Sequence, residues 1–382
     1  MEFDFIIFGG TGMQGRICAR DLLEQRYRVL LCGRDSSAIK ELLRNKKARF
    51  MRVDLKHENE ITRAIKKSNP YNVVNCAELV YNVPVMRACL KTGKSCTDLG
   101  GLYSVTKEQF GLDSEFRKKK LTCITGCGST PGITNVMASY AVKEFDSVHT
   151  IELGFAWDSN IKEFVVPYSI KSIFDEFTQG PVLFCNGKIV KEPRAKHQGI
   201  FEFREIGKQM CYSIVHSEVF TFAKYYKEKG LKHIHYFAGF PEHSWEKIKT
   251  LIDLGFHSSE PVQVRGGIVK PRDVTAAVLK RLEVPKGYEE KENLWIRIKG
   301  KKNGKEKKIE MNCIVHTLKG WESAGSNVNT GRTISIISQM LKEGFIRQKG
   351  VYAPEAVVPS KYFFRELGER KMLVYQNNKR IN

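Results

Sequence analysis

The chain has 382 residues, 42% of them hydrophobic, which is enough to bury the cores of two globular domains and excludes a disordered chain. Its formal net charge of +21 at pH 7 could attract nucleic acid, an anionic membrane or acidic small molecules. The basic residues are scattered and lack the interleaved aromatic side chains of a single-strand groove, so nucleic acid is not an expected partner.

The sequence carries no signal for export, membrane insertion or metal binding. No apolar run approaches the ~20 residues of a membrane span, and the acidic start of the chain lacks the basic region of a signal peptide. We therefore expect a cytoplasmic protein without a membrane partner. The ten cysteines include no Cys-x-x-Cys pair, and the closest two, Cys123 and Cys127, have no histidine nearby in sequence. Reduced thiols and no metal site are expected.

The first third of the chain alternates short aliphatic runs with helical stretches, which is the pattern of βαβ units. Strands are expected at residues 5–8, 28–32, 48–53, 72–76, 95–99 and 121–125. Six such strands predict an α/β fold, with a doubly wound parallel sheet of the Rossmann type over residues 1–128.

After Gly126 the pattern changes to longer strands such as residues 150–157, with a helix near residues 168–177. Two Asn-Gly pairs, at 186–187 and 303–304, predict hairpins. We expect an α+β substrate-binding domain with a mixed or antiparallel sheet over residues 129–326. The basic run 299–308 flanks the second turn and is expected at an exposed hairpin tip.

The last segment, residues 327–382, is expected to be helical and to pack back on the Rossmann domain. Residues 327–341 have the periodicity of an amphipathic helix, residues 350–355 are rich in turn signals, and a final helix is expected near residues 362–370.

A glycine-rich loop follows the first strand and precedes a helical stretch, which is the context of a dinucleotide-binding fingerprint. We expect Gly10 to permit the tight turn, Gly12 to let the backbone approach the pyrophosphate and Gly15 to let helix and strand pack closely. The helix N-terminus would meet the phosphate charge. The expected cofactor-binding loop is Gly10, Thr11, Gly12, Met13, Gln14 and Gly15.

The end of the second strand decides between NADP and NAD. It reads Gly33-Arg34-Asp35, where Gly33 leaves room and Arg34 can fork onto a 2′-phosphate. NADP is therefore the expected cofactor, and Asp35 keeps NAD open. Asp54 could reach the adenine or cap the next helix. Asn75 and Ala77, after the fourth strand, would line the ribose and nicotinamide or simply end a core strand.

Several motifs together give the chain a family resemblance. Besides the glycine loop they are residues 75–77, the Asp-Leu-Gly-Gly at 98–101, the Thr-Pro-Gly-Ile-Thr-Asn at 130–135, His-Ser-Glu at 216–218 and the tail 350–355. With these motifs the chain resembles the saccharopine dehydrogenase-like family over nearly its whole length, with the nearest likeness to lysine 6-dehydrogenase and saccharopine reductase types.

The resemblance implies oxidation at a carbon that bears nitrogen. Hydride leaves for the nicotinamide, an imine forms, and water releases an aldehyde and an amine or ammonia. It further implies an amino-acid substrate of the lysine or saccharopine type and a homodimer formed through the sheet of the substrate domain. The lysine 6-dehydrogenase type brings an acidic residue where this chain has Gly33 and Arg34, so its NAD preference does not carry over.

The reaction needs a base of near-neutral pKa within reach of the substrate nitrogen. His216, at an expected strand-to-helix junction, is the first candidate, and Asp98, at the carboxyl end of the fifth strand, is the second. Each has a structural alternative, a capping role. Candidate substrate contacts are the helix start Thr130, Pro131, Gly132 and Asn135, although a proline there also simply favours a helix start. An arginine fork from Arg204 or Arg332 could bind the carboxylate, and Tyr168 could line the cleft or pack as a core aromatic.

Two other functions stay open. The spacing Gly9-x-x-Gly12-x-x-Gly15 also occurs in short-chain reductases, and Tyr103 with Lys107 supplies a Tyr-x-x-x-Lys pair, although it comes too early in the chain. That reading predicts a carbonyl reductase. The third possibility is a non-catalytic scaffold that senses dinucleotides, because fold alone does not settle function.

Overall fold

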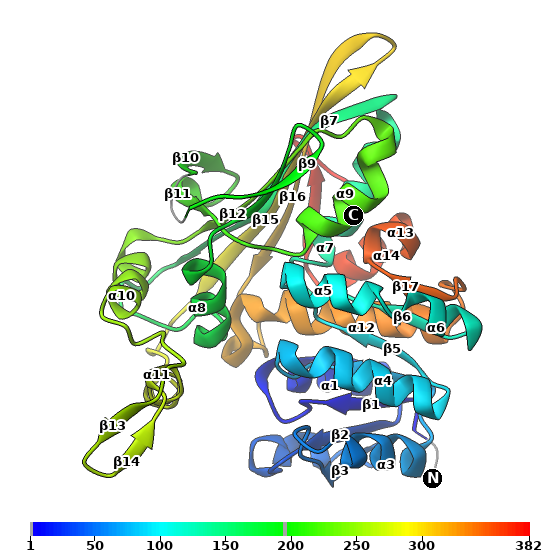
Figure 1. Ribbon diagram of the computed structural model, residues 1–382, viewed down its shortest axis with the longest axis vertical. Helices are drawn as coiled ribbons and strands as arrows, with labels where there is room; N and C mark the ends of the chain where they lie inside the picture. The colour runs from blue at the N-terminus through cyan, green and yellow to red at the C-terminus, as the bar shows by residue number, and fades with distance from the viewer. Residues whose placement is uncertain (1–2, 194–196) are drawn as a thin grey trace.

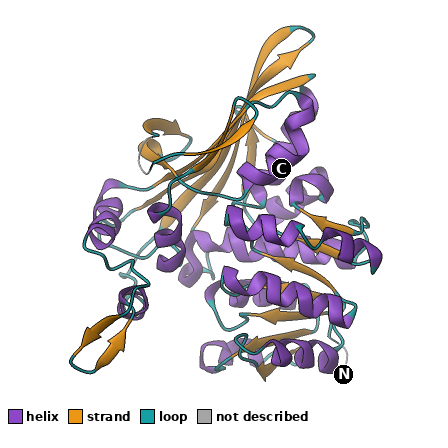
Figure 2. Cartoon of the chain, in the orientation of Figure 1, coloured by secondary structure: helices purple, strands orange, loops and turns teal. Residues whose placement is uncertain are grey.

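A computed structural model describes residues 3–193 and 197–382. The described chain forms a seven-stranded sheet, a ten-stranded sheet and a separate two-stranded hairpin. Figure 1 shows the seven-stranded sheet with its helices at one end of the molecule and the longer strands of the second sheet at the other, and Figure 2 shows helices on both faces of the first sheet.

The seven-stranded sheet is the predicted Rossmann sheet, and all of its neighbouring strands are parallel. The six predicted strands are confirmed within one or two residues at each end, and the strand order is β17-β6-β5-β4-β1-β2-β3. Their bounds are β1 Phe5–Phe8, β2 Val29–Gly33, β3 Ala48–Arg52, β4 Asn72–Asn75, β5 Ser95–Asp98 and β6 Thr122–Ile124.

Both faces of this sheet are buried. Along β1, Phe5 and Ile7 join the large core shared with the second domain, and Ile6 and Phe8 join a separate core. Successive side chains of a strand point to opposite faces, which is why β1 and β2 read as continuous apolar runs. The edge strand β3 is partly exposed and carries two arginines. The helices of this part are α1 Met13–Glu24, α2 Lys40–Leu43, α3 Glu58–Ser68, α4 Asn82–Thr92, α5 Tyr103–Phe110 and α6 Asp113–Lys118.

The second sheet has the order β10-β11-β12-β7-β15-β16-β18-β19, with β8 paired to β12 and to β9. Both Asn-Gly hairpins are confirmed, because Asn186 and Asn303 and the glycines after them have positive φ, as a type I′ turn requires. The bounds are β7 Ser147–Ser159, β8 Val182–Cys185, β9 Lys188–Lys191, β10 Gln198–Phe203, β11 Gly207–Ser213, β12 His233–Gly239, β15 Glu290–Lys302 and β16 Lys305–His316. The basic run lies at the exposed tip of the β15–β16 hairpin, as expected.

The helices of the second domain are α7 Ile133–Ala141, α8 Ile170–Thr178, α9 Glu218–Tyr226, α10 Glu242–Asp253 and α11 Pro271–Leu279. The hairpin β13 Val262–Val264 with β14 Gly267–Val269 precedes α11 and projects from the body of the molecule (Figure 1).

The C-terminal segment differs from the helical expectation in three ways. Helix α12, Val328–Lys342, packs against α1, β4 and β5, but all except two of its residues are buried, so it is a core helix and not an amphipathic one. The turn-rich residues include β17, Gly350–Tyr352, which adds a parallel edge strand beside β6. After α13 Pro354–Val357 and α14 Ser360–Glu369, β18 Leu373–Gln376 and β19 Lys379–Arg380 extend the second sheet.

Among the described residues, no helix is both long and apolar enough to cross a membrane.

Candidate active site

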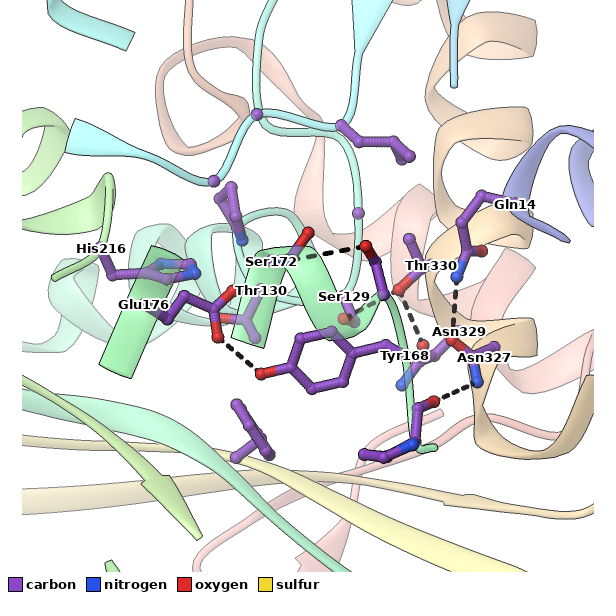
Figure 3. A pocket seen from close by; sticks show the side chains of 18 of the residues that line it. Gln14, Ser129, Thr130, Tyr168, Ser172, Glu176, His216, Asn327, Asn329 and Thr330 are labelled. Carbon is purple, nitrogen blue, oxygen red and sulfur yellow. Dashed lines mark hydrogen bonds between the residues drawn. The ribbon is translucent and has the colours of Figure 1, made fainter. Parts of the chain in front are cut away.

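A cavity of about 200 Å³ lies at the carboxyl edge of the Rossmann sheet, where ligands of open α/β sheets bind. The loops after β4, β5 and β6 form one wall, and strands β7, β12 and β15 of the second sheet form the opposite wall. Helix α8 and the start of α12 complete it (Figure 3). The site is therefore built from both domains.

The glycine loop has the geometry of a phosphate site. Gly12 is exposed, and a Cβ placed on it would meet only the Gly9 carbonyl, so its backbone is open to a ligand. Helix α1 begins at Met13 without a side-chain cap and without an acidic residue in its first turn. These first-turn amides fit a pyrophosphate.

One detail of the predicted loop is corrected. The residue with positive φ in the tight turn is Gly9, at +70°, and not Gly10. Gly10 is needed because a Cβ would press on the carbonyl of Ile7, and Gly15 because a Cβ would overlap the Gly9 carbonyl. The close packing expected at Gly15 is confirmed.

The end of β2 presents the exposed side chain of Arg34. Asp35, by contrast, turns back and accepts hydrogen bonds from the amide and hydroxyl of Ser37, at 2.8 and 2.7 Å. Both carboxylate oxygens of Asp35 are therefore engaged within their own loop. Gly33 leaves no empty space, since a Cβ there would strike the side chain of Thr11.

The other two expected cofactor positions shape loops. Asp54 accepts from the amide of Lys56 at 3.1 Å and so caps the turn after β3, whereas the N-cap of α3 is His57. Asn75 is buried and accepts from the amide of Ala77 at 3.2 Å. The backbone of Ala77 lies against Gly9, so both residues fix the crevice beside the glycine loop.

Gln14 links the cofactor loop to the cavity. It lines the cavity, its Nε2 donates to Oδ1 of Asn327 at 2.9 Å, and its Oε1 is buried without a hydrogen-bond partner among the described residues. Asn327 in turn donates to the carbonyl of Pro167 at 2.8 Å. The loop that would hold pyrophosphate and the wall of the cavity are therefore one connected structure.

His216 lies on the cavity wall at the predicted strand-to-helix junction, between β11 and α9. Its Nδ1 contacts the carboxylate of Glu218, which is buried and also accepts from the Thr130 hydroxyl at 2.7 Å. Burial by itself would lower the pKa of His216, but the carboxylates of Glu218 and Glu176 raise it above its ordinary value. The imidazole is poised to carry a proton near neutral pH.

Two further carboxylates face the cavity. Tyr168 donates to Oε2 of Glu176 at 2.5 Å, and Asn329 donates to Glu292 (Figure 3 shows Tyr168, Glu176 and Asn329). Burial raises the pKa of Glu176 to about 7 and that of Glu292 to about 8. Both carboxyl groups would ionise more readily beside a positive charge.

Three predicted substrate contacts do line the cavity, namely Thr130, Pro131 and Tyr168. Two others at the same helix start do not. Asn135 is fully buried, accepts from the Gly132 amide at 2.8 Å and donates to Glu355 at 2.7 Å. Asn135 and Gly132 therefore shape the start of α7, whereas the residues just before it, Thr130 and Pro131, face the cavity.

The arginines expected to bind a carboxylate lie outside the cavity, which corrects that expectation. Arg204 stacks over the ring of Tyr375, 3.9 Å from its centroid. Arg332 lies in α12, where its Nε is 3.4 Å from Oδ1 of Asp21. Its guanidinium group stacks over the ring of Trp321. Neither belongs to the lining.

The predicted role of Asp98 as a base is also corrected, because the structure places this residue where it organises loops. It is buried and accepts from the Gly100 amide at 2.8 Å, the Thr125 hydroxyl at 3.0 Å and Nε2 of Gln109 at 2.6 Å. Burial raises its pKa to about 7, yet it does not line the cavity. It fixes the loops after β5 and β6 that do.

The Tyr-x-x-x-Lys pair of a short-chain reductase is not placed for catalysis. Tyr103 packs edge-on against Phe220, with ring centroids 5.9 Å apart, and Lys107 is exposed. Neither residue lines the cavity.

Sequence reasoning missed Glu176, Glu292, Tyr236 and Asn329. A signal for Glu292 was present in the sequence. Glu290 and Glu292 stand at alternate positions of β15 in line with the buried Leu294 and Ile296, so all four side chains point to the same face of the strand. Alternation places such residues on one face, so charged residues there must face a core or a cavity. For the others no local pattern separates a cavity residue from a core residue.

The Rossmann sheet, the open glycine loop and the adjoining cavity with its buried histidine together define an oxidoreductase that uses a nicotinamide dinucleotide. Models of two protein-family domains match the chain: the saccharopine dehydrogenase NADP binding domain over residues 5–124 and the saccharopine dehydrogenase C-terminal domain over residues 128–372. The chain belongs to the saccharopine dehydrogenase family, and its cofactor is NADP, with NAD possible.

Similar proteins include enzymes named for carboxylated amines. The chain is 26% identical to carboxynorspermidine synthase of Vibrio alginolyticus over 281 residues, which cover 69% of this chain and 66% of that enzyme, just under two thirds of its length. It is 24% identical to carboxyaminopropylagmatine dehydrogenase of Synechocystis sp., with 95% of each chain covered. The solved structure of apo saccharopine dehydrogenase (L-Glu forming) from Saccharomyces cerevisiae has the same fold, with a TM-score of 0.75, 12% identity and full coverage of both chains.

Proposed function

We propose that the enzyme forms or cleaves the secondary-amine C–N bond between an amino-acid carbon skeleton and a cationic aliphatic amine, with NADP(H) as the redox partner. The charge of the cavity carries this proposal. Glu176 and Glu292 line it, as does Asp175, whose carboxylate is paired with Arg272 at 3.0 Å. Apart from His216, none of the described lining residues carries a basic side chain. Such a cavity attracts ammonium groups and repels additional carboxylates.

The negative charge of the cavity distinguishes between the possible substrates that the family resemblance implies. Saccharopine joins lysine and glutamate skeletons and so carries several carboxylates, which call for arginine forks. Arg204 and Arg332 lie elsewhere. A substrate with one amino-acid arm and an amine tail, as the names of the two relatives describe, fits the carboxylates better. Lysine itself stays a candidate because its terminal ammonium is cationic.

The aromatic wall supports an elongated aliphatic chain. Phe155, Trp157 and Tyr168 line the cavity, and their faces pack well against methylene groups and attract cations. Neutral donors such as Ser129, Ser172 and Thr330 also line it and can bind the single carboxylate of the amino-acid arm.

In the reducing direction an amine and an aldehyde lose water to form an imine, the imine carbon gains a hydride, and its nitrogen gains a proton. NADPH, when bound over the glycine loop, supplies that hydride. The chain supplies the rest: Glu176 and Glu292 hold the amine tail, and Nε2 of His216 exchanges the proton with the reacting nitrogen. Because Nδ1 of His216 is held by Glu218, the proton must leave from Nε2.

The test is a rate assay of NADPH oxidation with an amino-acid semialdehyde and a series of amines. We expect turnover to rise from a monoamine to a diamine or an agmatine-like amine, and activity in reverse with the corresponding carboxylated amine. Turnover only with saccharopine, or only with glutamate as the amine donor, would contradict the cationic-substrate proposal. The expected homodimer remains a prediction that sedimentation analysis would test.

A further inference from the structure

Away from the cavity, one sulfur and two imidazole nitrogens gather on the second sheet. Cys185 ends β8, and His233 begins β12. The antiparallel register pairs Phe184 with Ile234, so Cys185 stands opposite His233 and on the same face of the sheet. His235 is two residues further along β12 and therefore shares that face. The ligand atoms of the three side chains lie within 4.8 Å of one another.

A third imidazole approaches the same place. The ring of His197, which precedes β10, lies edge-on to the ring of His235, with centroids 5.9 Å apart. Nε2 of His197 is buried and has no hydrogen-bond partner among the described residues. A buried polar nitrogen without a partner calls for an explanation, and a bound ion is one.

The donor set indicates the kind of ion. One thiolate and three imidazoles suit Zn²⁺, which takes four such ligands in a tetrahedron, whereas Ca²⁺ and Mg²⁺ require oxygen ligands. Zinc–sulfur and zinc–nitrogen bonds place tetrahedral ligand atoms roughly 3.5 Å apart. The ligand atoms of Cys185, His233 and His235 lie within 4.8 Å of one another, so metal binding requires them and His197 to move closer together.

We propose that Cys185, His233, His235 and His197 form a zinc site on the second sheet, separate from the active site. The site would be structural. Strand β8 pairs with β12 through one residue pair, so its attachment to the sheet is slight. A metal bridging Cys185 to the histidines of β12 clamps the β8–β9 hairpin to the sheet. Because β8 follows α8 closely in the chain, the clamp also steadies the helix that carries Glu176.

Two measurements on the full chain test the site. Zinc titration of chelator-treated protein should show one Zn²⁺ per chain and a rise in Tm that grows with zinc concentration. Replacement of zinc by Co²⁺ should give the thiolate-to-cobalt charge-transfer absorption that only a cysteine ligand produces. Absence of this absorption in the unaltered protein would overturn the role of Cys185 without any variant.

Variants then assign the ligands. Cys185→Ser and His235→Gln should weaken zinc binding by more than the ~10–100-fold that loss of a supporting partner costs, and should abolish the zinc-dependent rise in Tm. His57→Gln, an exposed histidine of the Rossmann domain, is the matched control and should bind zinc like the unaltered protein. Equal zinc affinity in all of these proteins would mean nonspecific binding and would overturn the proposal.

Discussion

The imidazole of His216 lies flat against the phenol ring of Tyr236, with ring centroids 3.9 Å apart and planes 12° apart. Thr130 connects the pair to the other domain, because its hydroxyl contacts the Tyr236 hydroxyl at 3.0 Å and donates to Glu218 at 2.7 Å. Thr130 follows β6 of the Rossmann sheet, and Tyr236 lies in β12 of the second sheet. The imidazole of His216 is therefore held by both domains, and its position depends on their packing.

Removal of His216 tests its role as the acid–base group. His216→Gln should lower kcat by about 10²–10⁴-fold, the usual contribution of a positioned proton donor, with little change in the KM for NADPH. Tyr103→Phe is the control and should retain full activity, since Tyr103 packs on Phe220 outside the cavity. The opposite result, an inactive Tyr103→Phe and an active His216→Gln, would favour a short-chain-reductase mechanism.

Glu218 sets the charge of His216. In Glu218→Gln the negative charge that raises the pKa of His216 is lost while burial, which lowers it, remains. The protonated imidazole therefore disappears at a lower pH, and the upper limb of the kcat/KM profile for amine formation should move down by about one pH unit or more. A profile that keeps the same upper limb would show that another group supplies the proton.

Glu292 should couple substrate binding to pH. Because burial raises its pKa to about 8, more of it is ionised as the pH rises from 6.5 to 8.5, while an aliphatic amine, with a pKa near ~10, keeps its charge. The KM for the amine should therefore fall over this range, and Glu292→Gln should raise the KM and flatten its pH dependence. Glu246→Gln, on the exposed side of α10, is the control. An unchanged pH dependence in Glu292→Gln would remove this carboxylate from substrate recognition.

Arg34 should select NADP over NAD. Arg34→Ala should raise the KM for NADPH by about 10–100-fold, the worth of a charge-assisted phosphate contact, and leave the KM for NADH nearly unchanged. Arg44→Ala, an exposed arginine paired with Glu41 at 2.8 Å, is the control. Equal effects of Arg34→Ala on both cofactors would place the 2′-phosphate elsewhere.

Asp98 should affect the pH dependence of stability and not the reaction. Burial raises its pKa to about 7, so between about pH 4 and pH 7 the native state keeps a proton that the unfolded chain releases. Its contribution to the free energy of unfolding is thus complete below pH 4 and is lost as the pH rises through 7, by at most about 1.4 kcal/mol per pH unit. Asp98→Asn should remove this part of the slope in denaturant titrations at pH 5 to 8.

The same variant tests catalysis. Gln109 can turn its amide to match the new side chain, because it contacts both Asp98 and Thr125. Asp98→Asn should therefore keep kcat within a few fold of the unaltered enzyme. A loss as large as that of His216→Gln would restore Asp98 as a base.

The Rossmann domain could be predicted because its signals are local. Strands β1 and β2 are continuous apolar runs, and the glycine loop stands directly between β1 and α1. Even so, the sequence predicted Gly10 as the glycine of the tight turn, whereas the structure has Gly9 there. The backbone of Gly9 lies against that of Ala77, and this contact exists only in the folded sheet. The edge strand β17 was missed because its three residues gain their regular hydrogen bonds from β6, more than 200 positions away.

The amino-acid sequence by itself determined the fold class, the family, the cofactor loop and the position of His216, because periodicity and short motifs act over a few neighbouring residues. Only the tertiary structure decided which polar groups share a cavity. It turned Asp98, Asn135, Arg204 and Arg332 toward structural partners and brought Glu176 and Glu292 together from distant elements. It likewise brought Cys185 beside His233 by strand pairing. Contacts between segments far apart in the chain depend on the packing of whole sheets, which no local pattern contains.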